Sequence, residues 1–257
     1  MLVFDRLAVR RHRDRAARTV VQVADVLRDA AERLLDRLDD TNRRFTDALD
    51  VGGRGIVASM LRQRGMRVVS CDLSPTMAAL NGGPCVAADE EFLPFAPASF
   101  DLIIASLSLH WVNDLPGALL QLRQALRPEG LLLASLPALG TLAELRTALT
   151  EAEAEIAGGA SPRVSPFPEL RDCAHLLQRA GFTVPVADME EIRLLYADPF
   201  ALLTDLRAAG ETNAIRQRAR SAPIGALFPA ALAKLPTDGV RVAVTLRMAV
   251  LTGWAPG

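Results

Sequence analysis

The sequence predicts an α/β fold: a central, mostly parallel sheet of seven strands with helices on both faces, an N-terminal helical cap and a helical insertion before the last strand. Three observations support this prediction. Short apolar runs alternate with helical or turn-rich connections, as in strands joined by crossover helices. Prolines at 94, 97, 116, 128 and 137 fall between the runs, where a missing N–H does least damage. Half of the 257 residues are apolar, which is enough for one sizeable core.

The first 40 residues form the predicted cap. Residues 4–18 hold six arginines, and residues 20–38 repeat apolar side chains at the three- and four-residue spacing of an amphipathic helix. The arginine-rich stretch has two interpretations. It is either the solvated start of a helix, or a surface that engages a protein substrate or closes over a site, because guanidinium groups pair well with carboxylates.

Residues 41–257 form the predicted main domain. Strands are expected at 45–51, 66–72, 84–89, 100–106, 130–136, 182–191 and near 240–251, and helices at 56–64, 141–156 and 169–180. The Gly-, Ser- and Pro-rich loop 158–168 is typical of a surface connection and also of a lid. A mostly helical insertion is expected at about 198–236, where substrate specificity would naturally reside.

Bulk composition excludes several classes of protein. A formal net charge of −1 gives no reason to expect nucleic acid or an anionic membrane as partner. The three cysteines, Cys71, Cys85 and Cys173, are odd in number and widely spaced, which argues against a disulfide framework or a zinc ribbon. The sequence contains no run of about 18 apolar residues, the length that an integral membrane helix needs. We therefore expect a cytoplasmic protein.

A glycine-rich turn follows the first strand. The segment from Asp50 to Gly55 reads D-V-G-G-R-G and runs from an apolar strand straight into a helix. Gly52, Gly53 and Gly55 would let the backbone approach a ligand, because no Cβ stands in the way. The alternative is a tight strand-to-helix turn that serves only packing.

Two further acids close the next two strands. Asp72 lies 22 residues after Asp50, where a carboxylate can accept hydrogen bonds from ribose hydroxyls, and Asp89 lies 17 residues later, where one could take an adenine amino group. Asp72 could instead cap the helix that begins at Ser74-Pro75, although Ser74 suits that position better. Asp89 could be an ordinary surface acid.

These residues predict a nucleoside site at the carboxyl edge of the sheet. A dinucleotide is disfavoured because the turn is not G-x-G-x-x-G and holds Arg54 where small residues are usual. A zwitterionic aminocarboxypropyl group suits the turn better: Asp50 can meet its ammonium, and backbone N–H groups can meet its carboxylate.

The motifs at Asp50–Gly55, Asp72, Asp89 and 100–102 resemble those of Rossmann-like class I S-adenosylmethionine-dependent methyltransferases, over residues 45–137. A second resemblance runs almost end to end, to the mitochondrial and alphaproteobacterial complex I (NADH dehydrogenase) assembly factors of the arginine-hydroxylase type. It rests on FDR at 4–6, DEEFLPF at 89–95, SLSLHWVNDLP at 106–116, TLAELR at 141–146, SPF at 165–167, RAGF at 179–182, GETN at 210–213 and GW at 253–254.

The resemblance implies S-adenosylmethionine as cofactor, S-adenosylhomocysteine as its product, and a cofactor site that also includes Leu73, Glu90 and Ser106. Substrate would meet the cofactor after the fourth strand, which makes Ser106, His110 and Trp111 the catalytic candidates. Histidine could act as a base, whereas His110 and Trp111 could equally be only the wall of the pocket. Asn113-Asp114 with Pro116 should cap the next helix.

The family resemblance also implies a substrate: an arginine of an iron–sulfur subunit of complex I. No metal is predicted, because His12, His110 and His175 lie in separate segments without an H-x-D pair. Two alternatives stay open, an O-methyltransferase of a small molecule or a malonyl-carrier-protein thioester, and a non-catalytic assembly factor. The turn departs from the usual D-L-G-C-G-x-G by one missing residue, which would re-aim its amides and put cofactor affinity in doubt.

Overall fold

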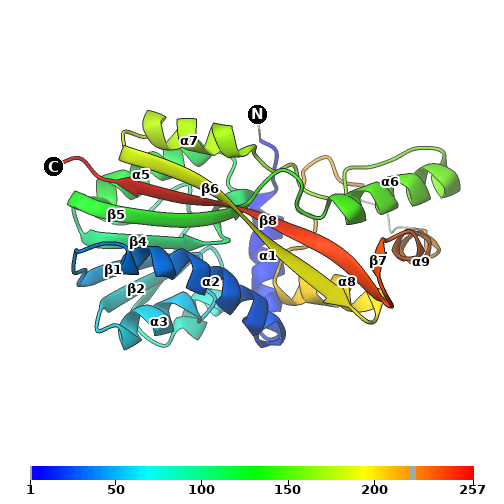
Figure 1. Ribbon diagram of the computed structural model, residues 1–257, viewed down its shortest axis with the longest axis horizontal. Coiled ribbons are helices and arrows are strands. Elements are labelled where there is room, and N and C mark those ends of the chain that lie inside the picture. Colours follow the sequence, from blue (N-terminus) through cyan, green and yellow to red (C-terminus); the bar gives the residue numbers. More distant parts are fainter. Residues whose placement is uncertain (1, 220–223) are drawn as a thin grey trace.

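The sheet of the computed structural model follows the predicted succession of apolar runs (Figure 1), and the structure describes residues 2–219 and 224–257. Its strands are β1 (Asp47–Val51), β2 (Arg67–Asp72), β3 (Cys85–Ala87), β4 (Phe100–Ser106), β5 (Leu126–Pro137), β6 (Thr183–Tyr196), β7 (Thr237–Asp238) and β8 (Arg241–Trp254). They are arranged in the order β3-β2-β1-β4-β5-β8-β6, with β7 paired to β8. The seven predicted strands are confirmed, and β7 is a two-residue addition.

A single strand, β8, runs opposite to all its neighbours in the order of the sheet. The ladders from β3 to β5 are parallel, whereas β8 is antiparallel to both β5 and β6. The chain leaves β1 toward β2 on one side and later returns to β4 on the other. The carboxyl ends of β1 and β4 therefore flank the switch point at which open α/β sheets bind ligands.

Helices cover both faces of the sheet. The α-helices are α1 (Arg6–Ala16), α2 (Ala24–Asp39), α3 (Val57–Gln63), α4 (Pro75–Ala78), α5 (Leu115–Ala125), α6 (Ala143–Ala157), α7 (Leu170–Arg179), α8 (Pro199–Ala208) and α9 (Leu227–Ala233). Figure 1 shows α5 and α7 on one face and α2 and α3 on the other. Each face buries its own apolar cluster, around Leu119 and Leu122 on the first and Leu34 and Leu61 on the second.

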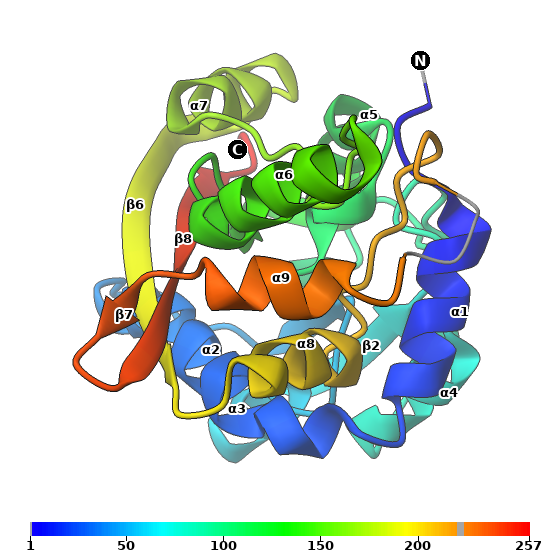
Figure 2. The ribbon, with the colours of Figure 1, turned by 90° about the vertical axis from the view of Figure 1, so that its right-hand side faces the viewer.

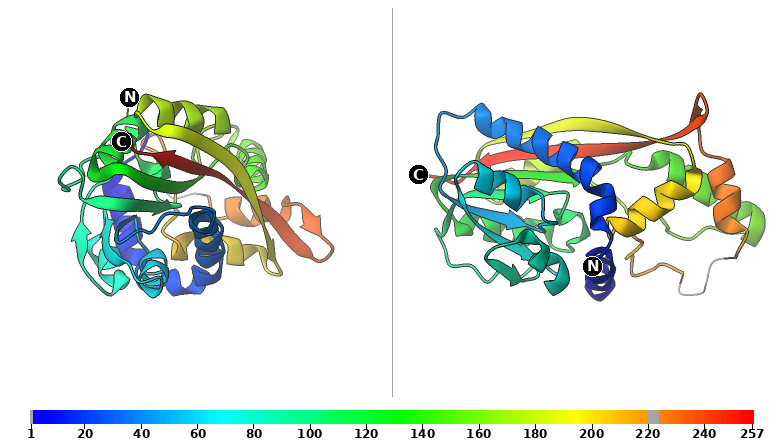
Figure 3. Two further views of the ribbon diagram at one scale, coloured as in Figure 1. Left: turned by 60° about the vertical axis from the view of Figure 1, so that its left-hand side comes forward. Right: turned by 90° about the horizontal axis from the view of Figure 1, so that it is seen from below.

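Three strand boundaries differ from the prediction for local reasons. β3 ends at Ala87, because Asp89 forms a tight bridge with Phe92. β5 begins at Leu126, which pairs with Phe100 across a register shift. β6 continues to Tyr196, because its last residues pair with β8 in a ribbon that runs past the rest of the sheet (Figure 3).

Acidic and hydroxyl side chains cap several helices. Ser74 accepts a hydrogen bond from the Met77 N–H at 3.0 Å, and Asp114 accepts one from the Gly117 N–H at 3.0 Å. Each stands just before a proline in the first turn. The two predicted caps are present, because each side chain satisfies an N–H that the helix leaves unpaired.

The cap and the insertion meet at the far end of the molecule. Figure 2 shows α6, α9 and α8 stacked beside the long ends of β6 and β8, with α1 at their side. The insertion is helical at both ends, whereas the chain from Gly210 to Ile215 is irregular because it pairs with the N-terminus: Phe4 bridges Ile215, and the Asp5 N–H donates to Ala214 O at 2.8 Å. Among the described residues no helix combines the length and apolar character needed to cross a membrane.

Candidate functional site

The three predicted acids lie at one rim of the sheet. Asp50 is the penultimate residue of β1, Asp72 is the last residue of β2, and Asp89 lies two residues after the end of β3. Because these strands are parallel neighbours, their carboxyl ends share an edge. The structure therefore brings the three carboxylates together, and the groups beside each of them decide what the site can hold.

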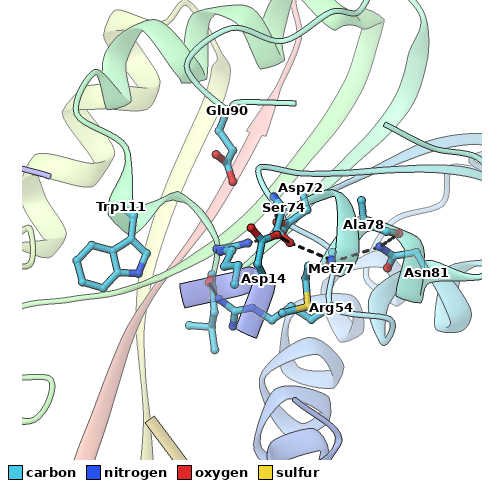
Figure 4. A network of polar contacts seen from close by, with 12 residues as sticks. Asp14, Arg54, Asp72, Ser74, Met77, Ala78, Asn81, Glu90 and Trp111 are labelled. Atoms are coloured by element: carbon cyan, nitrogen blue, oxygen red, sulfur yellow. Dashed lines mark hydrogen bonds and ion pairs between the residues drawn. The ribbon is translucent and has the colours of Figure 1, made fainter. Parts of the chain in front are cut away.

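Asp72 is already paired with an arginine of the cap. Arg13 of α1 donates to one oxygen of Asp72, and the Ser74 N–H donates to the other at 2.7 Å. Both side chains are almost fully excluded from solvent, at 2% and 0% exposed. Figure 4 shows Asp72 beside Ser74 and Asp14, with Arg54 close to them. Asp72 thus does not itself cap the helix after Pro75; its carboxylate holds Arg13.

Asp89 and Glu90 are paired with a second arginine of the same helix. The Arg6 guanidinium donates to Asp89 Oδ1 at 2.6 Å, to Glu90, and to the Trp111 carbonyl at 3.1 Å. Glu90 is buried and Arg6 half-buried. One helix therefore spans the rim. Both interpretations of the arginine-rich stretch apply to different residues. Arg10 and its exposed neighbours are solvated, whereas Arg6 and Arg13 lie over the rim.

The glycine turn is tightly packed. A Cβ on Gly52, whose φ is +68°, would stand 2.3 Å from Ser108 Cβ, and one on Gly53 would stand 2.4 Å from Asp50 Oδ2. The N–H groups of Gly52 and Gly53 donate to Cys71 O at 2.7 and 3.2 Å, and that of Gly55 to Asn81 Oδ1 at 2.9 Å. The amides that were predicted to meet a ligand carboxylate are engaged within the chain.

Asp50 is the exception at this rim. Asp50 is 1% exposed, and among the described residues no other side chain hydrogen-bonds its carboxyl oxygens, which feel only a weak backbone interaction with the Ala58 N–H. Burial raises the pKa of Asp50 to about 7, since an unpaired charge is costly away from water. Such a group is suited to receive a cationic partner.

The catalytic candidates lie after β4. Ser106 ends the strand opposite Ser135, and His110 and Trp111 are buried in a short 3-10 turn, Leu109–Trp111. Between them Leu107 has a φ of 48°, a conformation that costs a non-glycine residue energy and often marks a functional loop. The three candidates are therefore held close together by one strained connection.

Glu211 joins this loop to the glycine turn. One of its oxygens accepts from Arg54 Nη2 at 2.5 Å, and the other lies 2.7 Å from both His110 Nε2 and Trp111 Nε1. Arg54 also donates to Leu107 O at 3.0 Å. Burial by itself would raise the pKa of Glu211, but His110 and Arg54 hold that pKa far below its ordinary range. Glu211 is thus an ionised, fully used acceptor.

An apolar cavity of about 450 Å³ opens beside this cluster. Arg54, His110, Trp111 and Glu211 line its polar end. Further wall residues come from α6, α8, α9 and the long ends of β6 and β8, including Leu145, Leu149, Leu202, Leu206, Phe228 and Leu246. The start of α2 and the loop 161–167 also belong to the wall. Asp50, Asp72 and Asp89 are not part of this lining. The cavity therefore adjoins the glycine turn through Arg54, whereas the three carboxylates of the rim do not line it.

No metal centre accompanies the cluster. Within residues 2–219 and 224–257, no three His, Cys, Asp or Glu side chains are grouped so that they could hold an ion. Cys71 and Cys173 are buried, and burial raises the pKa of both thiols, most of all that of Cys71.

Comparison with known proteins places this geometry in a class. The family model described as "Methyltransferase domain" matches residues 49–134. Two solved structures share the fold: a SAM-dependent methyltransferase from Methanosarcina mazei (TM-score 0.55, 11% identity, 86% of this chain and 98% of that one), and a phosphoethanolamine N-methyltransferase from Haemonchus contortus in complex with S-adenosylhomocysteine (TM-score 0.51, 18% identity, 88% and 53%). The fold is that of a class I S-adenosylmethionine-dependent methyltransferase, and the chain is an enzyme of that type.

Sequence relatives narrow the class. The zebrafish protein "Arginine-hydroxylase NDUFAF5, mitochondrial" is 36% identical over all of this chain and 84% of its own length, and the human one is 41% identical over 82% of this chain and 64% of its own. A malonyl-acyl-carrier-protein O-methyltransferase from Xylella fastidiosa is 37% identical over 84% of this chain and 75% of its own. The chain belongs to the class I methyltransferase family that includes the arginine-hydroxylase NDUFAF5 proteins.

S-adenosylmethionine is the cofactor of this class, and the rim fits it only in part. The unpartnered carboxyl of Asp50 suits the cofactor's ammonium. The amides of the shortened turn point to Cys71 and Asn81, and the carboxylates for ribose and adenine hold Arg13 and Arg6. With α1 docked in this way, the residues do not accommodate the nucleoside.

Four residues of the site were missed by sequence reasoning. Arg6 and Arg13 are seven residues apart and therefore share a helix face with the buried Val9 and Ala16, a periodicity that could have revealed them. From the sequence alone, Arg54 is only an argument against a dinucleotide, and Glu211 is only one letter of the GETN motif. Their pairing across 157 residues leaves no local signal.

Proposed function

We propose that the chain is a methyltransferase-fold enzyme that modifies an arginine in an iron–sulfur subunit of respiratory complex I and so assists assembly of that complex. The relatives named as arginine hydroxylases support this substrate, and the segments of the sequence resemblance supply the structural argument. They lie far apart in the chain, and three of them meet in the fold.

Three of those segments converge after β4, and this observation carries the proposal. The Phe4 N–H donates to Asn113 Oδ1 at 2.8 Å, and the Phe4 ring packs edge-on against Trp111 at 5.2 Å. Trp111 in turn donates to Glu211 at 2.7 Å. FDR, SLSLHWVNDLP and GETN are thereby joined around one group of side chains, as expected for a shared active site.

Within this proposal the predicted residues keep their roles. S-adenosylmethionine supplies an activated methyl group when it is bound. Asp50 and the turn of Gly52, Gly53 and Gly55 would hold its amino-acid end, and Asp72, Leu73, Asp89, Glu90 and Ser106 its nucleoside. Ser106, His110 and Trp111 would face the substrate. Leu73 now packs against α1 residues, so that its role too requires α1 to move.

The apolar cavity favours a second candidate, an O-methyltransferase of a carrier-protein thioester. A space of about 450 Å³ with a mostly apolar wall suits an apolar acyl or thioester arm better than a solvated peptide. The malonyl-acyl-carrier-protein relatives support this alternative. Arg13 on Asp72 favours the third candidate, a non-catalytic assembly factor, because a chain that never binds the cofactor can afford a permanent occupant there.

Two measurements decide among these candidates. Calorimetry with S-adenosylmethionine and S-adenosylhomocysteine should detect binding if the chain is an enzyme. No heat of binding at millimolar ligand would exclude both enzymes and support the non-catalytic assembly factor. Mass spectrometry of complex I subunits from a strain lacking this gene should then show an arginine without its modification. An unchanged arginine mass would remove the arginine substrate and favour the thioester.

The proposal includes a location. We place the protein in the bacterial cytoplasm, peripheral to the inner membrane through its complex I partner. Fractionation with and without assembled complex I tests this: release of the chain from membranes when the complex is absent is the expected result, and unchanged membrane attachment would contradict it.

A further inference from the structure

Glu211 is the centre of a hydrogen-bond arrangement that assigns a role to each ring nitrogen of His110. Glu211 Oε2 lies 2.7 Å from His110 Nε2, and the His110 side chain is 3% exposed. The other ring nitrogen, Nδ1, is buried and has no hydrogen-bond partner among the described residues. The ring is therefore anchored at one end and unsatisfied at the other.

The charge of Glu211 fixes which nitrogen carries the proton. Burial raises the pKa of Glu211, but the Arg54 guanidinium at 2.5 Å lowers it, and an ionised carboxylate can only accept hydrogen bonds. His110 Nε2 must then donate. In a neutral imidazole the other nitrogen carries the lone pair. Nδ1 is consequently a buried hydrogen-bond acceptor without a donor, and an unsatisfied polar atom of this kind costs about 1–3 kcal/mol of folding free energy.

We propose that Glu211 is a positioning residue that locks His110 in the Nε2–H tautomer, so that Nδ1 is the proton acceptor for an O–H or N–H group of a substrate in the apolar cavity. His110 lines that cavity at its polar end, and its Nδ1 is itself covered, so that a substrate group reaches it only when the ring or the wall beside it moves. In the step, the substrate X–H bond breaks, its electron pair stays on X, and an N–H bond forms at Nδ1. The resulting imidazolium is balanced by the Glu211 carboxylate.

Arg54 completes the arrangement. It is 5% exposed and pairs with the Glu211 oxygen that His110 does not use. Its carbonyl contact at Leu107 ties the pair to the strained connection after β4. Arg54, although it lies in the glycine turn, therefore positions Glu211 and through it His110 rather than the cofactor. The substrate in this inference depends on the proposed enzymatic function, whereas the assignment of the proton to Nε2 depends only on the contacts of Glu211.

Nitrogen NMR tests the assignment without substrate or cofactor. The chain has three histidines, so ¹⁵N-histidine labelling gives three imidazole spectra, and His12→Gln and His175→Gln identify the two that are not His110. In alkaline buffer, long-range ¹H–¹⁵N correlations should place the His110 proton on Nε2 and leave Nδ1 unprotonated. A proton on Nδ1, or a ring that stays doubly protonated, would overturn the proposal.

Glu211→Gln provides the matched variant. The carboxylate accepts at both oxygens, and no orientation of an amide can accept from Arg54 on one side and from His110 and Trp111 on the other. We expect loss of the wild-type tautomer signal. Asp205→Asn, which changes another acid of the same cavity, should leave the His110 spectrum as it is. An unchanged spectrum in Glu211→Gln would refute the positioning role even if cofactor binding is later established, and loss of cofactor binding would not affect it.

Discussion

Arg13 of α1 and Asp72 of β2 form an ion pair from which solvent is almost completely excluded. The same carboxylate is the predicted acceptor for the ribose hydroxyls of the cofactor. A Cβ on Gly52 would lie 3.3 Å from Arg13 Nη1, so the guanidinium also borders the glycine turn. If Asp72 is the ribose acceptor, Arg13 and a nucleoside compete for the same carboxylate, and α1 occupies the rim.

Replacing Arg13 with Met should strengthen cofactor binding. The variant keeps an unbranched side chain but frees Asp72, whose unpaired charge then costs about 3–5 kcal/mol until a ligand partners it. We expect at least a tenfold lower Kd for S-adenosylhomocysteine, about 1.4 kcal/mol, measured by calorimetry. Arg10→Met, on the exposed side of the same helix, is the control and should bind like the parent. Weaker binding by Arg13→Met would mean that Arg13 supports the ligand rather than replacing it.

Asp72→Ala should have the opposite effect on binding. The change removes the ribose acceptor and leaves Arg13 buried without its partner, so both affinity and stability should fall. The measurement is again calorimetry with S-adenosylhomocysteine, together with urea unfolding. Asp14→Ala is the matched control, because Asp14 lies in the same polar group and bonds only Ser74 and Thr76 hydroxyls among the contacts described. Retained affinity in Asp72→Ala would remove the ribose assignment.

The fold was accessible from sequence because its signals are local. Apolar runs, their spacing and the caps at Ser74 and Asp114 are each written within a few residues, and the sheet follows from the alternation of strands and helices. The amides of Gly52 and Gly53 bond Cys71 O, and the re-aiming of the turn by one missing residue stays a prediction.

The occupants of the site were not accessible in the same way. Asp72 could be assigned to ribose from its place at a strand end, but its pairing with Arg13 depends on how α1 docks across 59 residues of sequence. The Arg54–Glu211 pair depends on an irregular segment whose path is set by contacts with the N-terminus. Periodicity and motif spacing do not encode such long-range side-chain pairings.

Gly52→Ala should cost more stability than Gly65→Ala, although both glycines have a left-handed backbone. The φ values are +68° and +85°, so each alanine loses about 1–2 kcal/mol from the backbone. At Gly52 the new Cβ also meets Ser108 Cβ at 2.3 Å, whereas nothing lies within 4 Å at Gly65. Overpacking should add about 1–3 kcal/mol, measured by urea unfolding. In Gly52→Ala/Ser108→Gly that excess should disappear; equal losses in the two single variants would refute the close packing of the turn.

Asp50 should make the folded state less stable as pH rises. Its pKa is about 7 in the fold against an ordinary 3.8, so between about pH 4 and pH 7 the folded chain keeps a proton that the unfolded chain has released. Stability then falls across this window, by about 4 kcal/mol in all, and is not recovered at higher pH. Asp50→Asn cannot ionise and should lack this loss.

The difference between parent and Asp50→Asn isolates the effect. Asp47, whose pKa its arginine partners lower to about 2, contributes with the opposite sign but is present in both chains and cancels. Free energies of unfolding in urea at pH 5 and pH 8 should therefore diverge, with the parent losing more than the variant. Parallel pH profiles would show that Asp50 has a charged partner in solution, and the rim would then no longer offer an unpaired carboxyl to the ammonium of a cofactor.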